Sequence, residues 1–78
     1  MGDMKDKVYW VIKSEKSKEY FAGYYPNTKE PQFINDLNQA GLCLTKEYAL
    51  KGKKELYLYG CGKLRIIPVK RDTTIVEI

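Results

Sequence analysis

The stretch TKEYALKGKKELYLYG, residues 45–60, decides the fold because it carries the signals of a helix at both ends. Thr45 is a good N-cap, Glu47 places an anion near the positive end of the helix dipole, and Gly60 supplies the left-handed position after the last turn. We therefore predict a helix from about residue 46 to residue 59. Three- and four-residue spacing gives it a buried side, opposite Lys51, Lys54 and Glu55, made of Tyr48, Ala49, Gly52, Leu56 and Tyr59.

Part of this stretch has a second interpretation. Gly52 costs about 1 kcal/mol relative to alanine inside a helix, and Leu50 and Leu58 fall outside the predicted buried side. The alternative is that residues 55–69, ELYLYGCGKLRIIPV, form a hairpin that turns at GCG. We favour the helix because its cap and stop signals agree.

The segments before the helix alternate as strands do. KVYWVIKS (7–14) places Val8, Trp10 and Ile12 on one face, and EYFAGYY (19–25) follows after the polar loop SEKSK. These segments predict an antiparallel hairpin, with a bulge at Gly23 because glycine weakens the interior of a strand.

The segment PNTKEP (26–31) interrupts the sheet because proline lacks a backbone donor. The following segment, QFINDLNQAG (32–41), has Phe33, Leu37 and Ala40 at helical spacing. It predicts a short helical turn, packed by Phe33 and Leu37, capped by Asn35 or Asp36 and ended by Gly41. LCLT (42–45) then predicts a brief strand, with Cys43 between two core leucines.

Two strands complete the predicted fold. KLRIIPVKR (63–71) alternates, and Pro68 limits it to an edge or a bulge; the last strand returns after a turn at Arg71 and Asp72. The prediction is a flexible segment at 1–6 and a single α+β domain at 7–78 with a mainly antiparallel sheet. The residues predicted to lie in or beside its core are Trp10, Ile12, Phe33, Leu37, Ala49, Leu56, Ile66 and Val69.

The composition argues against several classes of function. The 78 residues include no histidine, which removes the commonest general base and the usual catalytic triads. The acidic residues are scattered between lysines, and no carboxylate pair lies in an apolar segment that would separate their pKa values. Cys43 and Cys61 are too few for a disulfide framework or a zinc site, so we expect reduced thiols, with a bridge between them as the alternative. We therefore expect no catalysis, no metal and no cofactor.

The apolar runs are short. The longest, Val8 to Ile12, is far below the length that crosses a bilayer, and the charged N-terminus leads into no signal-peptide core. These features predict a cytoplasmic protein that does not enter a membrane.

Two kinds of residue suggest binding. Seven tyrosines exceed what so small a core can bury, and an interaction surface could use Tyr24, Tyr25, Tyr57 and Tyr59. The net charge is +4, and nucleic-acid binding, the alternative, would use Lys51, Lys53, Lys54, Lys63 and Arg65. Lysine outnumbers arginine twelve to two, whereas base readout and phosphate forks favour arginine.

The succession VYWVIKS, KEYFAGYY, FINDLNQAG, LTKEYAL and GKLRIIPVK resembles a loosely defined group of small proteins encoded by phages and prophages of Gram-positive bacteria. The resemblance covers roughly residues 7 to 70, at positions that determine the fold. It carries over no site residues. It implies a viral accessory role, in which a small basic protein without catalytic groups binds and diverts a host or defence protein.

Overall fold

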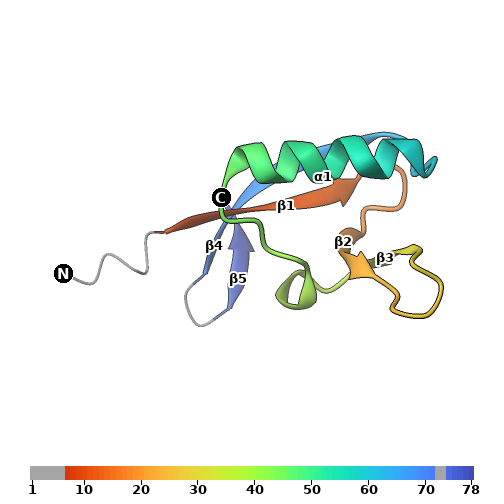
Figure 1. Ribbon diagram of the computed structural model, residues 1–78. Helices are drawn as coiled ribbons and strands as arrows, with labels where there is room; N and C mark the ends of the chain where they lie inside the picture. The colour runs from red at the N-terminus through yellow and green to blue at the C-terminus, as the bar shows by residue number, and fades with distance from the viewer. Residues whose placement is uncertain (1–6, 72–73) are drawn as a thin grey trace.

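The computed structural model describes residues 7–71 and 74–78, in which one α-helix lies on a five-stranded antiparallel sheet of order β3-β2-β1-β4-β5 (Figure 1). The predicted α+β class is confirmed. The predicted segment 1–6 and Asp72 of the predicted turn lie outside the described residues. Along the chain the elements are β1 (Val8–Ser14), β2 (Tyr20–Tyr24), β3 (Pro31–Ile34), the 3-10 helix η2 (Leu37–Gln39), α1 (Lys46–Leu58), β4 (Leu64–Arg71) and β5 (Ile75–Glu77).

Strands β1 and β4 form the centre of the sheet, paired from Val8 and Lys70 to Ser14 and Leu64. Helix α1 runs along these two strands on one face of the sheet (Figure 1). Beneath it, Ile12, Leu56 and Leu64 form one buried cluster. Because side chains alternate along a strand, the neighbours of these residues face the other way.

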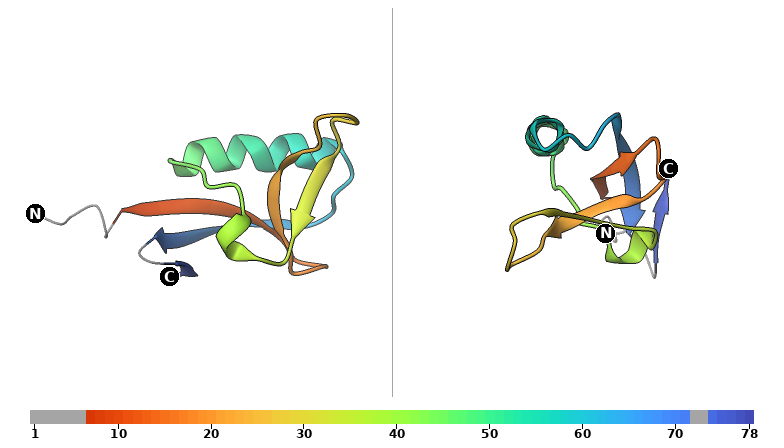
Figure 2. Two further views of the ribbon diagram at one scale, coloured as in Figure 1. Left: turned by 90° about the horizontal axis from the view of Figure 1, so that it is seen from below. Right: turned by 90° about the vertical axis from the view of Figure 1, so that its right-hand side faces the viewer.

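The second buried cluster lies on the opposite face of the sheet and contains Val11, Ala40 and Val69. The sheet curls around this cluster: β2 and β3 run steeply across the direction of β1 (Figure 2). The predicted β1–β2 hairpin is present, but β2 pairs with β1 only at its start, where Lys13 lies opposite Tyr20. The predicted bulge is present too, since the β2–β3 register shifts between Phe21 and Gly23, and Gly23 has a φ of 117°.

The prediction for residues 32–41 is partly wrong. Asp36 does cap a short helical turn, η2, but Phe33 belongs to strand β3, where it pairs with Phe21. Phe33 packs beside the cluster under α1, whereas Leu37 and Ala40 belong to the cluster on the other face. The helical spacing of Phe33, Leu37 and Ala40 therefore does not reflect one helix, because these residues pack on opposite faces of the sheet.

The prediction for LCLT is also only partly right. Cys43 exchanges two backbone hydrogen bonds with Trp10, at 2.9 and 2.8 Å, and forms one isolated bridge rather than a strand. Leu44, predicted to lie in the core, is 64% exposed. It directly precedes Thr45, the cap of α1, where the chain turns outward from the sheet.

The expectation that Pro68 marks an edge or a bulge is wrong, because β4 lies inside the sheet between β1 and β5. In the β1–β4 ladder Pro68 is opposite Trp10. The backbone N–H and C=O of Trp10 both bond to Cys43 and therefore point away from β4. Strand β1 thus needs no donor from residue 68, and the missing N–H leaves no orphaned acceptor there.

Candidate interaction surface

Helix α1 begins at Lys46 as predicted and ends at Leu58, one residue before the predicted end. The Thr45 hydroxyl accepts a hydrogen bond from the backbone N–H of Tyr48 at 3.1 Å, and Gly60 has a φ of 78° just past the C-cap. Residues 55–58 are helical, so the alternative hairpin is wrong. The helix therefore holds its side chains in a fixed relation to the sheet.

The helix buries little and exposes much. Only Ala49 and Leu56 are fully buried. The large side chains Tyr48, Leu50, Tyr57 and Leu58 are 68%, 47%, 72% and 84% exposed, respectively. Leu50 and Leu58 lie outside the buried side as expected.

Tyr48 and Tyr59, in contrast, were placed on the buried side, and this prediction is wrong, since Tyr59 is 54% exposed. The helix packs on β1 and β4. Strand β2 runs across the direction of β1 (Figure 2) and reaches the helix near its C-terminal end through Tyr24.

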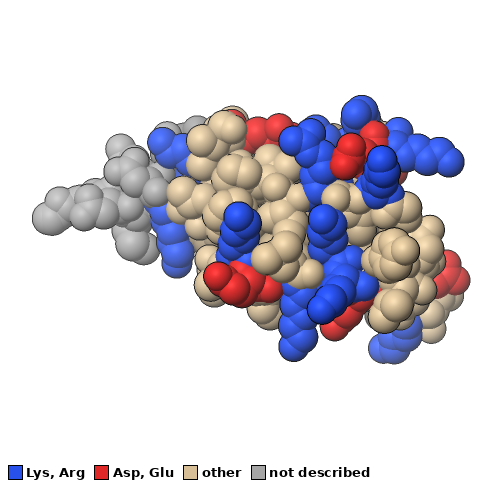
Figure 3. All heavy atoms as spheres, turned by 90° about the horizontal axis from the view of Figure 1, so that it is seen from above, with Lys and Arg blue, Asp and Glu red and all other residues tan. Residues whose placement is uncertain are grey.

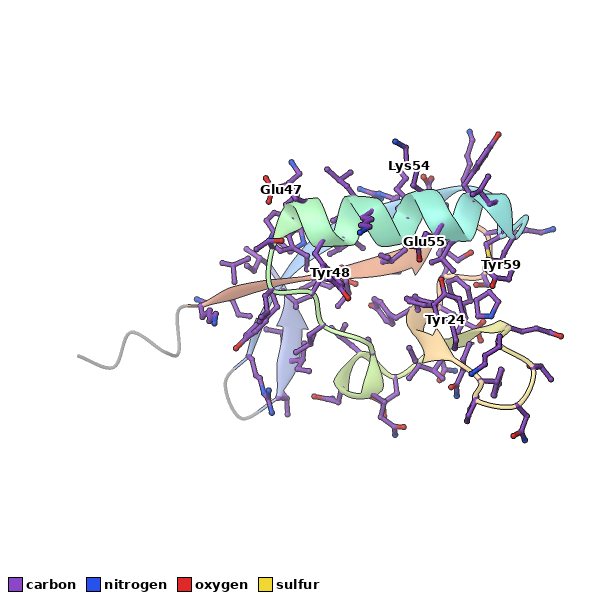
Figure 4. The ribbon with its side chains drawn as sticks, in the orientation of Figure 1. Tyr24, Glu47, Tyr48, Lys54, Glu55 and Tyr59 are labelled. Atoms are coloured by element: carbon purple, nitrogen blue, oxygen red, sulfur yellow. The ribbon has the colours of Figure 1, made fainter. Side chains whose placement is uncertain are left out.

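Two of the predicted tyrosines meet on one flank of α1, near its C-terminal end. The rings of Tyr24 on β2 and Tyr59 after α1 lie 5.8 Å apart between centroids (Figure 4). They line an open groove of about 530 Å³, here called the tyrosine groove, with Lys29, Glu55 and Leu58. The Tyr24 hydroxyl donates to Glu55 Oε1 over 3.5 Å. Burial, with the Glu55 carboxylate, raises the pKa of Tyr24, which favours the protonated, hydrogen-bond-donating phenol.

Tyr57 lies on the opposite flank of α1, where its neighbours are mainly lysines. It lines an open groove of about 550 Å³, here called the lysine groove, with Leu50, Lys51, Lys53 and Lys54. An adjoining groove shares Lys53 and Tyr57 and extends to Glu15 and Lys63. Lysine side chains on this side of the molecule are separated by uncharged and acidic groups rather than forming one continuous band (Figure 3).

The structure thus divides both predicted sets of residues. Tyr24 and Tyr59 lie together, Tyr57 lies across the helix, and Tyr25 is 47% exposed in the loop between β2 and β3. Lys51, Lys53 and Lys54 share one groove with Tyr57, and Lys63 adjoins it.

Arg65 does not join these lysines. It alternates with Leu64, which packs under α1, and so belongs to the opposite face of β4, where its charge acts on Glu77.

Sequence reasoning passed over Leu50 and Leu58 as site residues. The signal was available, because large apolar residues that fall outside the buried side of a helix must meet solvent or a partner. Lys29, which lines the tyrosine groove with Leu58, comes from a segment distant in sequence and left no comparable signal.

A polar cluster was also missed, on the curled side of the sheet. Glu77 of β5 accepts hydrogen bonds from the Tyr20 hydroxyl at 2.5 Å and from Lys13 Nζ at 3.2 Å. The bond from Tyr20, followed by that from Lys13, lowers the pKa of the Glu77 carboxyl. These contacts tie the last strand to β1 and β2 and have a structural explanation.

The two cysteines are free thiols, as expected. Burial raises the pKa of both Cys43 and Cys61, which disfavours the reactive thiolate at neutral pH. Within residues 7–71 and 74–78, no cluster of three or more potential metal ligands occurs. In the same part of the chain, no helix has the length and apolar character needed to span a membrane.

Comparison with known proteins returned no match: no family model, curated protein sequence or solved structure is significantly similar to this chain. The resemblance to phage proteins stays a prediction.

Proposed function

We propose that this chain is a non-enzymatic accessory protein that binds another protein through the outer surface of α1. The observation that supports the proposal is the distribution of large apolar side chains on this helix. Leu50, Tyr57 and Leu58 all point to solvent, while the helix is held on the sheet by Ala49 and Leu56. Concentrated apolar exposure on a small domain is typical of a protein interaction site.

The target we propose is a host or defence protein, in a cytoplasmic setting, on the basis of the resemblance to phage and prophage proteins. Such a protein acts by occupying a surface of its target and requires no catalytic group. The raised pKa values of the two thiols agree with this proposal, since they leave neither cysteine activated as a nucleophile.

Nucleic-acid binding is the second candidate. The observation in its favour is that Lys51, Lys53 and Lys54 share a groove with Tyr57, an arrangement that offers phosphate contacts beside one ring for stacking. Against it, Leu50 in the same groove has no π-face, and Arg65 lies on the other side of β4. The protein-binding proposal accounts for the leucines, and nucleic-acid binding does not.

The test is affinity capture from a lysate of Gram-positive bacteria, before and after nuclease treatment. We expect a protein to be retained after nuclease and lost with the double variant Leu50→Gln and Tyr57→Ala. Val76→Thr is the matched control, because Val76 is 51% exposed on β5, away from α1. Retention of nucleic acid alone, unaffected by the double variant and abolished by Lys51→Glu with Lys54→Glu, would refute the protein-binding proposal.

A further inference from the structure

The two flanks of α1 differ in charge. In the tyrosine groove Lys29 is accompanied by Glu55, which already accepts a hydrogen bond from Tyr24. The lysine groove has three lysines and no acidic residue among the side chains that line it. The adjoining groove contributes Lys63 and one carboxylate, Glu15. Lysines therefore outnumber carboxylates on the flank that carries Leu50 and Tyr57, where Glu15 and Glu55 line only the neighbouring grooves.

The apolar part of the lysine groove has a definite size. Leu50 and Tyr57 are separated by seven residues, or two turns, so they lie roughly 10 Å apart along the helix axis. That separation admits one large side chain of a partner between them. Lys51, Lys53 and Lys54 line the same groove, and their ammonium groups can pair with carboxylates on either side of the inserted residue.

A second copy of the chain fits this surface poorly. Two antiparallel α1 helices brought together at the lysine groove would oppose Lys51 and Lys54 of one copy to the same residues of the other. Like charges placed opposite each other disfavour association.

Nucleic acid is complementary to the charge of the groove but offers no apolar side chain to contact Leu50. An acidic polypeptide with an apolar side chain matches both the charge and the leucine.

We propose that the lysine groove binds an acidic polypeptide segment in which one large apolar residue inserts between Leu50 and Tyr57 and is flanked by Asp or Glu. The inference rests on the proposed function and specifies the chemistry of the partner. The apolar residue provides the buried contact, and the carboxylates provide orientation and rapid association.

The experiment begins with selection from random peptides of roughly a dozen residues, by mRNA display against the immobilised protein. We expect the enriched peptides to combine Asp and Glu with a Leu, Phe or Trp. The affinity of the most enriched peptide is then measured by fluorescence anisotropy, next to the same peptide with alanine at the apolar position. That change should weaken binding by about tenfold or more.

Variants of the protein locate the peptide. Lys51→Glu with Lys54→Glu, and separately Tyr57→Ala, should each weaken binding by about tenfold or more, while Tyr59→Ala in the tyrosine groove leaves it unchanged. These side chains are exposed, so the variants keep the fold, which far-ultraviolet circular dichroism verifies. Enriched peptides without an excess of acid, peptides that respond to Tyr59→Ala instead, or no enrichment at all would each overturn the inference.

The salt dependence of binding distinguishes an acidic peptide from nucleic acid as the ligand. Between about 50 and 300 mM NaCl, the affinity for single-stranded DNA held by four lysines should fall by roughly a hundredfold, through counterion release. A short acidic peptide lacks a condensed counterion layer, so its affinity should fall by about tenfold or less, through screening. Tighter binding of a labelled oligonucleotide than of the peptide would overturn the inference. If no acidic peptide binds but Leu50→Gln with Tyr57→Ala still abolishes protein capture, the partner chemistry is wrong and the proposed function stands.

Discussion

Leu56 and Leu58 are two residues apart on α1 and provide a matched test of how the helix is oriented. Leu56 is fully buried between Ile12 and Leu64, and Leu58 is 84% exposed. Both are leucines in the last turn of the same helix, so Leu→Ala removes the same atoms with the same effect on helix propensity. Any difference between the two variants reports burial.

The expected loss for Leu56→Ala follows from the atoms removed. Three buried carbon atoms at about 0.8 kcal/mol each contribute about 2.4 kcal/mol, and the cavity left behind raises the total to about 3 kcal/mol. In a domain of this size each kcal/mol lowers the melting temperature by about 4–8 °C, so the shift should be roughly 12–24 °C. For Leu58→Ala we expect a change within about 0.5 kcal/mol of zero.

Urea unfolding followed by Trp10 fluorescence and by circular dichroism measures both variants. Trp10 is a suitable probe because it lies on the helix side of β1, with Lys46 Nζ 5.7 Å from its ring. Equal losses for the two variants, or a loss above about 1 kcal/mol for Leu58→Ala, would show that the helix is rotated. The candidate interaction surface would then be part of the core.

Three further predictions concern the N-cap of α1, the packing of the helix on the sheet, and the dependence of stability on pH. Thr45→Ala should cost about 1 kcal/mol of unfolding free energy, and Thr45→Ser much less, because serine keeps the oxygen that caps α1. A Cβ at Gly52 would lie 3.1 Å from Ile12 Cδ1, an atom that valine lacks. Gly52→Ala should therefore be more stabilising in an Ile12→Val background than in the unchanged protein. A double-mutant cycle measured by denaturation should give a coupling of about 0.5–1 kcal/mol. Glu77→Gln should lower stability at neutral pH by less than about 1 kcal/mol. That difference should disappear on acid titration below pH 4.5, because the native contacts hold the pKa of Glu77 below this ordinary value and stabilise only the ionised carboxylate.

Local signals in the sequence were sufficient for α1. Thr45 and Gly60 act within one turn of the helix, so their effect does not depend on the rest of the fold. The central strands were predictable for the same reason: alternation in residues 8–14 and 64–71 assigns each side chain to a face without knowledge of the partner strand. The same alternation places Arg65 on the face opposite Leu64, away from α1, although sequence proximity alone joins it to Lys51, Lys53 and Lys54.

The errors arose where distant segments decide the outcome. Phe33 is in a strand because β2 offers it a register opposite Phe21, and no property of residues 32–41 alone indicates this. Tyr48 and Tyr59 are exposed because α1 packs on β1 and β4, while β2 curls across the direction of β1 and reaches the helix near its C-terminal end through Tyr24. The meeting of Tyr24 with Tyr59 likewise depends on this curl, so the sequence predicted the exposed tyrosines but not how they are grouped.

The outer surface of α1 allows folding and binding to be separated. Ala49 and Leu56 are the side chains of the helix that the core fully buries, so the fold does not require apolar residues at positions 50, 57 and 58. Exposed apolar groups promote association, and the surrounding lysines keep such a surface soluble. If these side chains were merely tolerated, polar replacements would leave both stability and binding intact. If they form a binding surface, polar replacements leave stability intact and abolish binding, which makes loss of capture by a fully folded variant the decisive observation.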